Sequence, residues 1–241
     1  MQKLFVSISL CCSFIVLASF TGSPVLYTTA VYETPSHNDD LSIGNATSIL
    51  YNELNLEEKG LSQKAFEYAY KGYLKLKAQN KIPNIGYLTI CDLSQSSKNK
   101  RLYLIDLHSN TIVMNTWVAH GRNSGAEFAT RFSNKPSSLQ SSLGFYVTGQ
   151  TYNGEHGLSL RIAGLEPGFN DKAYKRGIVI HGADYIGTGK LNCSYIGRSY
   201  GCPAVSKKES KLLIQTIKNG TCLFIYNPAK NYLKRSKILN D

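Results

Sequence analysis

The spacing of hydrophobic residues changes from a helical to a strand-like pattern near residue 84. Two helices are expected over residues 46–84, and the second begins at Ser62, a residue type that caps helix N-termini. The hydrophobic residues of this second helix recur at spacings of three and four, which places them on one face. They are Phe66, Ala69, Tyr73 and Leu76. The pattern predicts a helical layer that precedes a strand-rich region.

From residue 85 onward the pattern becomes strand-like: Ile85–Leu93 and Arg101–Leu107 alternate hydrophobic and polar residues, as half-buried strands do. The predicted strands are Ile85–Leu93, Arg101–Leu107, Thr111–Ala119, Leu143–Gly149, Leu158–Ala163, Gly177–Ile180 and Thr221–Tyr226. A final helix follows Ser206, because Ser206 and Glu209 fit a capping box, and Gly220 ends it. These elements predict a mainly β domain of the α+β class over residues 85–230, with an N-terminal helical layer and a C-terminal helix.

Four long segments between these elements are rich in Gly, Ser and Asn. They are residues 120–142, 150–157, 164–176 and 182–200. Loops of this length on a compact domain usually carry function, so we expect the functional site among them.

The two ends of the chain differ from this central region. A basic start at Met1–Lys3, an uncharged apolar run at Leu4–Phe20 and small residues up to Ala30 predict a secretory signal peptide over residues 1–30. Residues 31–45 are predicted as a polar spacer, and residues 231–241 as a basic tail. We therefore expect an exported protein of the periplasm or cell envelope, with no stable membrane span after leader cleavage.

Composition narrows the function only slightly. The chain has 241 residues, is 42% hydrophobic and carries a formal charge of +11, from 27 Lys and Arg against 16 Asp and Glu. These values exclude a disordered or fibrous protein and favour anionic partners such as an acidic wall polymer, but a basic surface also serves solubility.

The candidate chemistry lies between residues 177 and 206. A β-branched strand leads to His181, and Cys202 follows a glycine and precedes a proline. A cysteine nucleophile needs a partner that activates its thiol, normally a histidine. All five histidines precede Cys202, which excludes the papain-like order in which the cysteine comes first.

Two other interpretations compete with a catalytic cysteine. Removal of the leader leaves Cys91, Cys193, Cys202 and Cys222, and four cysteines in an oxidising compartment permit two disulfides. Cys91 and Cys222 lie on apolar strands and are expected to be buried as small hydrophobic residues. His120 and Glu127 approach a zinc-peptidase spacing, but the sequence has no His-x-His or His-Glu-x-x-His pair, so we predict no metal site.

His181-Gly182 followed by Ser199-Tyr200-Gly201-Cys202 resembles the signature of the YkuD-like L,D-transpeptidases, in particular the murein L,D-transpeptidase catalytic-domain subgroup. The similarity extends to Val118–Gly125, Phe132–Asn134 and Ser141–Phe145, and covers about residues 50–226. The resemblance implies a YkuD-like β-sandwich or barrel without a cofactor. It also implies that the partners are peptidoglycan stem peptides and not nucleic acid.

The resemblance also implies roles for individual residues. Cys202 attacks the carbonyl of the third residue of a tetrapeptide stem, D-alanine leaves, and the thioester is transferred to an amine of another stem. His181 takes the thiol proton and is oriented by the carbonyl of Gly182, and backbone N–H groups of Tyr200, Gly201 and Cys202 form the oxyanion hole. The expected substrate-binding residues are Arg198, Ser199, His120, Ser124 and Tyr146.

The sequence departs from the family at two positions. Tyr200 stands where many members have His, and Ala204 stands where many have a basic or amide residue. Both departures concern acceptor recognition, so the kind of cross-link stays open. An L,D-carboxypeptidase, in which water takes the acyl group, and a wall-binding protein without turnover are the alternatives.

Overall fold

The computed structural model describes residues 37–241, so the predicted signal peptide lies outside the described residues. Eight strands form one sheet in the order β3-β2-β1-β8-β4-β5-β6-β7. The strands are β1 (Tyr87–Asp92), β2 (Leu102–Asp106), β3 (Thr111–Thr116), β4 (Gly144–Gly154), β5 (Gly157–Gly164), β6 (Val179–Ala183), β7 (Ala204–Ser206) and β8 (Cys222–Tyr226). The mainly β, α+β class predicted from the sequence is confirmed.

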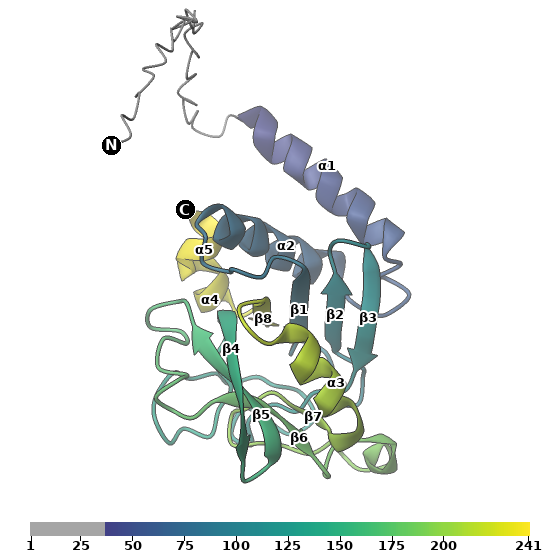
Figure 1. The fold of residues 1–241 in the computed structure, drawn as a ribbon, viewed down its shortest axis with the longest axis vertical. Coiled ribbons are helices and arrows are strands. Elements are labelled where there is room, and N and C mark those ends of the chain that lie inside the picture. Colours follow the sequence, from purple (N-terminus) through teal and green to yellow (C-terminus); the bar gives the residue numbers. More distant parts are fainter. Residues whose placement is uncertain (1–36) are drawn as a thin grey trace, which may run out of the picture. The chain divides into compact units, whose positions relative to one another are not determined.

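Helices cover the sheet at two places. The helices are α1 (His37–Glu53), α2 (Gln63–Ala78), α3 (Lys207–Ile217), α4 (Lys230–Arg235) and α5 (Lys237–Asn240), with a short 3-10 turn, η1, at Thr188–Lys190. Helix α2 packs on β1 and β8, and α3 packs on β5, β6 and β7 (Figure 1). Within residues 37–241, no helix has both the length and the apolar character that a membrane crossing requires.

The predicted helix caps are present. The side chain of Ser62 accepts a hydrogen bond from the backbone N–H of Ala65 at the start of α2. Ser206 accepts one from the N–H of Glu209 at the start of α3. Each cap satisfies a backbone donor that has no partner within its helix, so both helix starts are determined locally by sequence.

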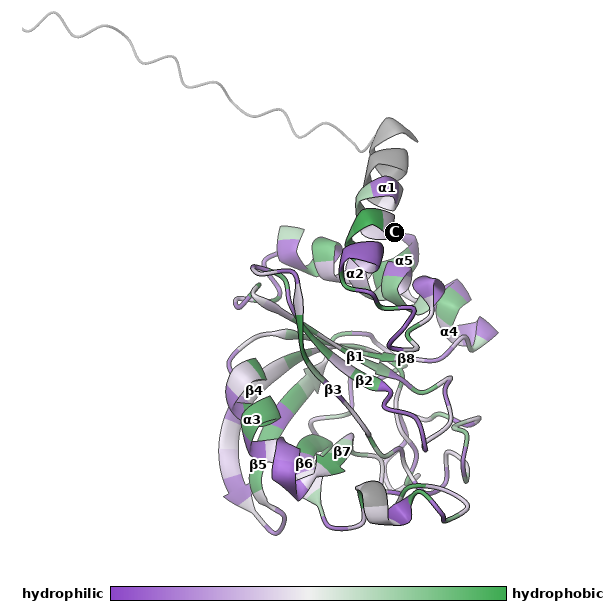
Figure 2. Cartoon of the chain, turned by 90° about the vertical axis from the view of Figure 1, so that its right-hand side faces the viewer, coloured by the Kyte–Doolittle hydropathy of each residue, from purple (hydrophilic) through white to green (hydrophobic). Residues whose placement is uncertain are grey.

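The core lies where α2 meets the central strands, which are predominantly hydrophobic (Figure 2). Phe145 of β4 stacks on Phe224 of β8 with ring centroids 4.1 Å apart. The Phe145 ring also fills the space beside Gly72 of α2, where a Cβ would lie 2.0 Å from the ring. A glycine inside a helix costs stability, and here it permits the close approach of the helix to the sheet.

Strand pairing brings the two candidate catalytic residues to one edge of the sheet. Strands β6 and β7 are parallel, and His181 pairs with Ala204, two positions after Cys202. The residues just before β7 therefore lie beside the residues just before His181. This pairing depends on β7, a three-residue strand that the sequence pattern did not predict.

The structure corrects three predictions of local structure. Residues 150–157 are not a loop, because β4 and β5 continue through them as a hairpin with an irregularity between Thr148 and Thr151. Helix α1 begins at His37, inside the predicted spacer 31–45. Residues 231–241 are not a free tail, because α4 and α5 bury Tyr232, Ile238 and Leu239.

Candidate active site

A cavity of about 750 Å³ lies at the edge formed by β6 and β7. The tip of the β4–β5 hairpin, the segment before β6 and the loop before β7 form its walls. Its lining includes Cys202, His181, His156, Arg176, Arg198, Ser199, Tyr200, Arg122, Tyr152, Tyr185 and Tyr195. Of the ten residues predicted for the site, Cys202, His181, Arg198, Ser199 and Tyr200 line this cavity.

Cys202 presents a neutral thiol to the cavity. The side chain is partly exposed, and Sγ lies 3.8 Å from the carbonyl oxygen of Gly177, its hydrogen-bond acceptor. Burial raises the pKa of the thiol, while the backbone N–H of Val179 and the guanidinium of Arg176 oppose the increase. A thiol with a raised pKa needs a base to remove its proton before it attacks a carbonyl.

His181 lies in β6 with its ring in a defined orientation. Its Nδ1 is 3.0 Å from the carbonyl oxygen of Gly182, an acceptor, so Nδ1 carries the proton and Nε2 is free to accept one. Burial lowers the pKa of His181; the Gly182 carbonyl raises it, and the neighbouring His156 lowers it. Within residues 37–241 no hydrogen bond joins His181 and Cys202, although both side chains line the same cavity.

His156 covers the ring of His181, which the sequence did not indicate. The two imidazoles stack with centroids 4.1 Å apart and an interplanar angle of 18°. His156 is exposed at the turn of the β4–β5 hairpin, the segment expected to be a loop. Because long-range strand pairing brings this turn to β6, no local sequence signal predicts the contact.

The turn before Cys202 requires a glycine. Gly201 has φ +125°, and a Cβ at this position would lie 2.8 Å from the carbonyl oxygen of Gln140. Ser199 fastens the same turn, because its hydroxyl donates to the carbonyl of Cys202 at 2.6 Å and accepts from the N–H of Gly201 at 3.0 Å. The loop therefore holds Cys202 in one backbone conformation.

The hydrogen bond to Ser199 changes the expected oxyanion hole. The N–H of Gly201 is already engaged and cannot also serve a ligand at full strength. The N–H groups of Tyr200 and Cys202 have no acceptor among residues 37–241. Two of the three expected donors are thus available.

Arg198 is held by backbone carbonyls at the rim of the cavity. Its Nη1 donates to the carbonyl oxygens of Arg122 and Gly125, each at 3.1 Å, and its Nη2 donates to the hydroxyl of Tyr195 at 2.9 Å. The side chain of Tyr200 is 68% exposed beside it. Arg198 thus orders the loop and presents a positive charge at the cavity mouth.

Three residues predicted to bind substrate are fully buried and do not line the cavity: His120, Ser124 and Tyr146. Arg101 donates to Nδ1 of His120 at 2.7 Å, and burial, with this cation, lowers the pKa of His120 to about 4. Ser124 accepts from the N–H of Ser141, and Tyr146 donates to the carbonyl of Ser142. All three stabilise loops from within, and none of them reaches the cavity that contains Cys202.

Arg176 also lines the cavity, at a position that no motif in the sequence indicated. Its guanidinium donates to the carbonyls of Ser133 and Gln140 at 2.8 and 2.7 Å, and to the hydroxyls of Ser142 and Ser138. It therefore secures the segment 133–142 against the cavity and places a cation near the Cys202 thiol. A single arginine in a polar loop carries no motif, so only the folded structure identifies it.

The four cysteines within residues 37–241 form no disulfide. Cys91, Cys193, Cys202 and Cys222 are free thiols, and Cys91 and Cys222 are fully buried, as predicted for small hydrophobic residues. In the same range, no group of three or more His, Cys, Asp or Glu residues could hold a metal ion.

The sequence matches the family model described as "L,D-transpeptidase catalytic domain" over residues 57–226. The chain matches no curated protein. The matched segment contains β1–β8, α2 and α3, so it covers both the sheet and the cavity.

Similar solved structures share little sequence with the chain. An L,D-transpeptidase from Mycobacterium smegmatis is 11% identical, with 59% of each chain covered and a TM-score of 0.38. L,D-transpeptidase 3 from Mycobacterium tuberculosis is 10% identical, with 59% of this chain and 61% of that one covered and a TM-score of 0.36. The helical cell shape determining protein Pgp2 from Campylobacter jejuni is 16% identical, with 58% and 48% covered and a TM-score of 0.34. The chain spans about half to three fifths of the length of these proteins.

Proposed function

Since this chain belongs to the L,D-transpeptidase catalytic domain family, we propose that it is an exported cysteine acyltransferase that cross-links peptidoglycan stem peptides. One observation carries the proposal: Cys202, next to a glycine-dependent turn, shares a cavity with a neutral His181 whose Nε2 is free. The cavity volume suits a short peptide, since ligand sites commonly enclose about 300–1,000 Å³.

In the proposed first half-reaction, Nε2 of His181 accepts the thiol proton as Sγ of Cys202 attacks the carbonyl of the third stem residue. The N–H groups of Tyr200 and Cys202 stabilise the resulting oxyanion. Collapse of the tetrahedral intermediate breaks the bond to D-alanine. The amine leaves with the proton from His181, and a thioester remains on Cys202.

In the second half-reaction, an amine of another stem attacks the thioester, and His181 takes the amine proton. A new amide forms and the Cys202 thiol is restored. Stem peptides carry carboxylates, and Arg122, Arg176 and Arg198 line the cavity that would receive them. Complementary charge of this kind mainly provides orientation and rapid association.

A His156→Phe variant is expected to move the acid limb of the kcat/KM profile to higher pH. His181 must be neutral to act as a base, and the charge on His156 is one of the causes that lower the pKa of His181. Phenylalanine keeps a flat ring for stacking but removes that charge, so the pKa of His181 rises and activity is lost earlier on acidification. The measurement is the pH dependence of D-alanine release.

The control for this variant is His108→Phe, because His108 lies in the β2–β3 turn and does not line the cavity. The control profile is expected to match the wild type. An acid limb of His156→Phe that stays in place, or moves to lower pH, would contradict the assigned electrostatic effect.

The proposed function is tested with purified disaccharide-tetrapeptides and mass spectrometry of both the peptides and the intact protein. Loss of D-alanine with formation of dimers, together with an acyl adduct on the protein, would support the transpeptidase. Loss of D-alanine with tripeptide as the only product would replace it by an L,D-carboxypeptidase. Activity that disappears on chelation would instead favour a zinc peptidase, and no product at all would leave a wall-binding protein.

A further inference from the structure

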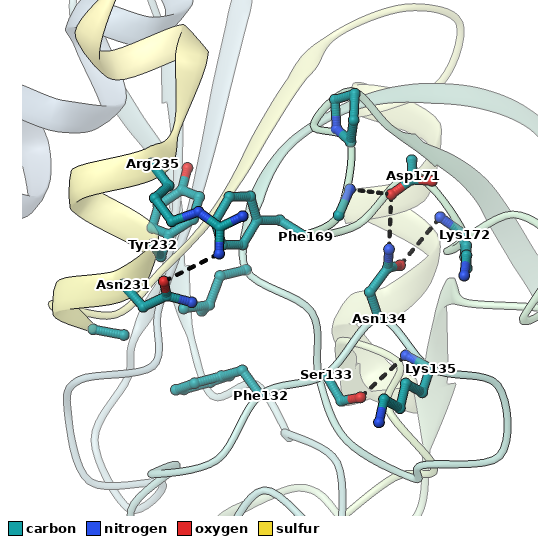
Figure 3. A pocket seen from close by; sticks show the side chains of 14 residues that line it. Phe132, Ser133, Asn134, Lys135, Phe169, Asp171, Lys172, Asn231, Tyr232 and Arg235 are labelled. Carbon is teal, nitrogen blue, oxygen red and sulfur yellow. Dashed lines mark hydrogen bonds between the residues drawn. The ribbon is translucent and has the colours of Figure 1, made fainter.

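A second cavity of about 660 Å³ shares no lining residue with the one that contains Cys202. It lies between the segment that begins at Phe132, residues 167–172 and helix α4. Figure 3 shows Phe132, Phe169 and Arg235 on one side of the hollow and Asn134, Asp171 and Lys172 on the other.

The rim of this cavity carries an excess of positive charge. Lys135, Lys172 and Arg235 line it, and Asp171 is the one acidic residue among the lining residues. Oδ1 of Asp171 accepts from the side chain of Asn134 at 2.7 Å and from the N–H of Gly168 at 2.6 Å, so this carboxylate orders the loop at 167–172.

The three cations have no carboxylate partner within residues 37–241. The two ion pairs of this part of the chain, Lys64–Glu67 and Lys207–Asp184, lie elsewhere. Within residues 37–241 the side chain of Arg235 makes one hydrogen bond, to the side-chain oxygen of Asn231 at 3.4 Å. Unpaired cations around one hollow favour an anionic ligand, because their mutual repulsion falls when an anion binds.

Aromatic rings form the apolar part of the same cavity. Phe132 and Phe169 are half-buried, and the Arg235 guanidinium lies 5.8 Å from the centroid of the Phe169 ring. Behind them the buried hydroxyl of Tyr232 donates to the carboxylate of Glu166 at 2.9 Å, which fixes the back wall. The chemistry therefore suits a ligand that combines carboxylates with an aliphatic chain or a sugar ring.

The two cavities are connected through one segment of chain. Ser133 lines the second cavity, and its carbonyl accepts from Arg176, which lines the first. Ser133 and Arg176 thus place a wall of one cavity against a wall of the other.

We propose that the second cavity is a binding subsite for a carboxylate-bearing segment of the peptidoglycan strand other than the stem that acylates Cys202. The inference rests on the proposed function for the identity of the polymer. The subsite holds the enzyme on the polymer and does not take part in the chemistry at Cys202.

The test uses the full chain with Cys202→Ala, so that the polymer is bound without turnover, and measures co-sedimentation with purified sacculi. A Lys172→Gln/Arg235→Gln pair in this background is expected to bind about fivefold more weakly, since each exposed charge contact contributes little alone. A Lys208→Gln/Lys211→Gln pair on α3 removes the same charge outside the cavity and is the matched control. The difference is expected to shrink as salt increases.

Equal binding by the two pairs would overturn the subsite, because net charge alone would then explain the result. Soluble polyglutamate is a second probe. If the Lys172→Gln/Arg235→Gln pair weakens polyglutamate binding as strongly as it weakens sacculi binding, the cavity is an unspecific anion site and the subsite is overturned. With Cys202 intact, the cavity variant is expected to process soluble tetrapeptide at the wild-type kcat. A wild-type chain that binds sacculi through the cavity but never releases D-alanine would contradict the proposed function and not the subsite.

Discussion

A Cys202→Ser variant is expected to lose at least about 10⁴-fold in kcat for D-alanine release, because replacing a nucleophile removes the covalent route altogether. Serine preserves the size of the side chain and its hydrogen-bonding capacity toward the Gly177 carbonyl. Its hydroxyl is a much weaker acid than a thiol, and a single neutral histidine activates it poorly. The measurement is release of D-alanine from disaccharide-tetrapeptide, with the acyl adduct followed by intact-protein mass.

The matched control is Cys193→Ser, which makes the same replacement at an exposed cysteine that does not line the cavity. This variant is expected to keep wild-type activity and to form the adduct at the wild-type rate. If Cys193→Ser loses activity and Cys202→Ser retains it, the nucleophile is Cys193 and the assignment of Cys202 is wrong. Retention in both variants would remove the thioester from the mechanism.

The sequence predicted most of the fold because its signals are local. The caps at Ser62 and Ser206 and the short apolar runs of β1, β2 and β8 need only neighbouring residues to be recognised. These three strands are buried along nearly their whole length, so the half-buried character expected of β1 and β2 was wrong. The failures depend on contacts between distant parts of the chain. Strand β7 has three residues and no periodicity, and it exists because Ala204–Ser206 pair with His181–Ala183.

Contacts between distant parts of the chain also explain why the regular structure of two further segments was not predicted. The β4–β5 hairpin was predicted to end in a long loop, because its glycines and asparagines resemble a turn composition. Cross-strand pairing overrides that composition as far as Gly154. The last residues resemble a basic tail in composition, yet Tyr232, Ile238 and Leu239 are buried. The Tyr232 hydroxyl also donates to the buried side chain of Glu166, a contact between distant parts of the chain.

In the candidate site, too, some residues were predictable from the local sequence and others were not. Cys202 and His181 were identified by a motif whose residues determine backbone shape as well as chemistry, since Gly201 adopts a conformation that other residues rarely adopt. His120 and Ser124 belong to the similar segment Val118–Gly125, and Tyr146 directly follows Ser141–Phe145, but all three support the loops from inside. A motif match does not distinguish a residue that touches the ligand from one that positions the loop. His156 and Arg176 reach the cavity by folding and have no motif at all.

A His181→Gln variant is expected to lower kcat/KM by about 10²–10⁴-fold, the range that general-base catalysis contributes. Glutamine keeps a polar side chain at a fully buried position in β6, but neither of its terminal atoms accepts a proton near pH 7. The raised pKa of Cys202 makes the loss severe, because the thiol does not ionise by itself at neutral pH. In the variant, activity is expected to increase with pH toward the pKa of the thiol instead of levelling off.

His156→Gln is the control for this variant, since it places the same side chain on the stacked neighbour and leaves the proposed base intact. It is expected to keep the wild-type plateau, and thermal unfolding of both variants establishes that each is folded. If His181→Gln retains a flat pH profile within about tenfold of the wild type, another group deprotonates Cys202. In that case the hydrogen bond from His181 to Gly182 serves only to hold strand β6, and the assignment of the base has to move to a different residue of the cavity.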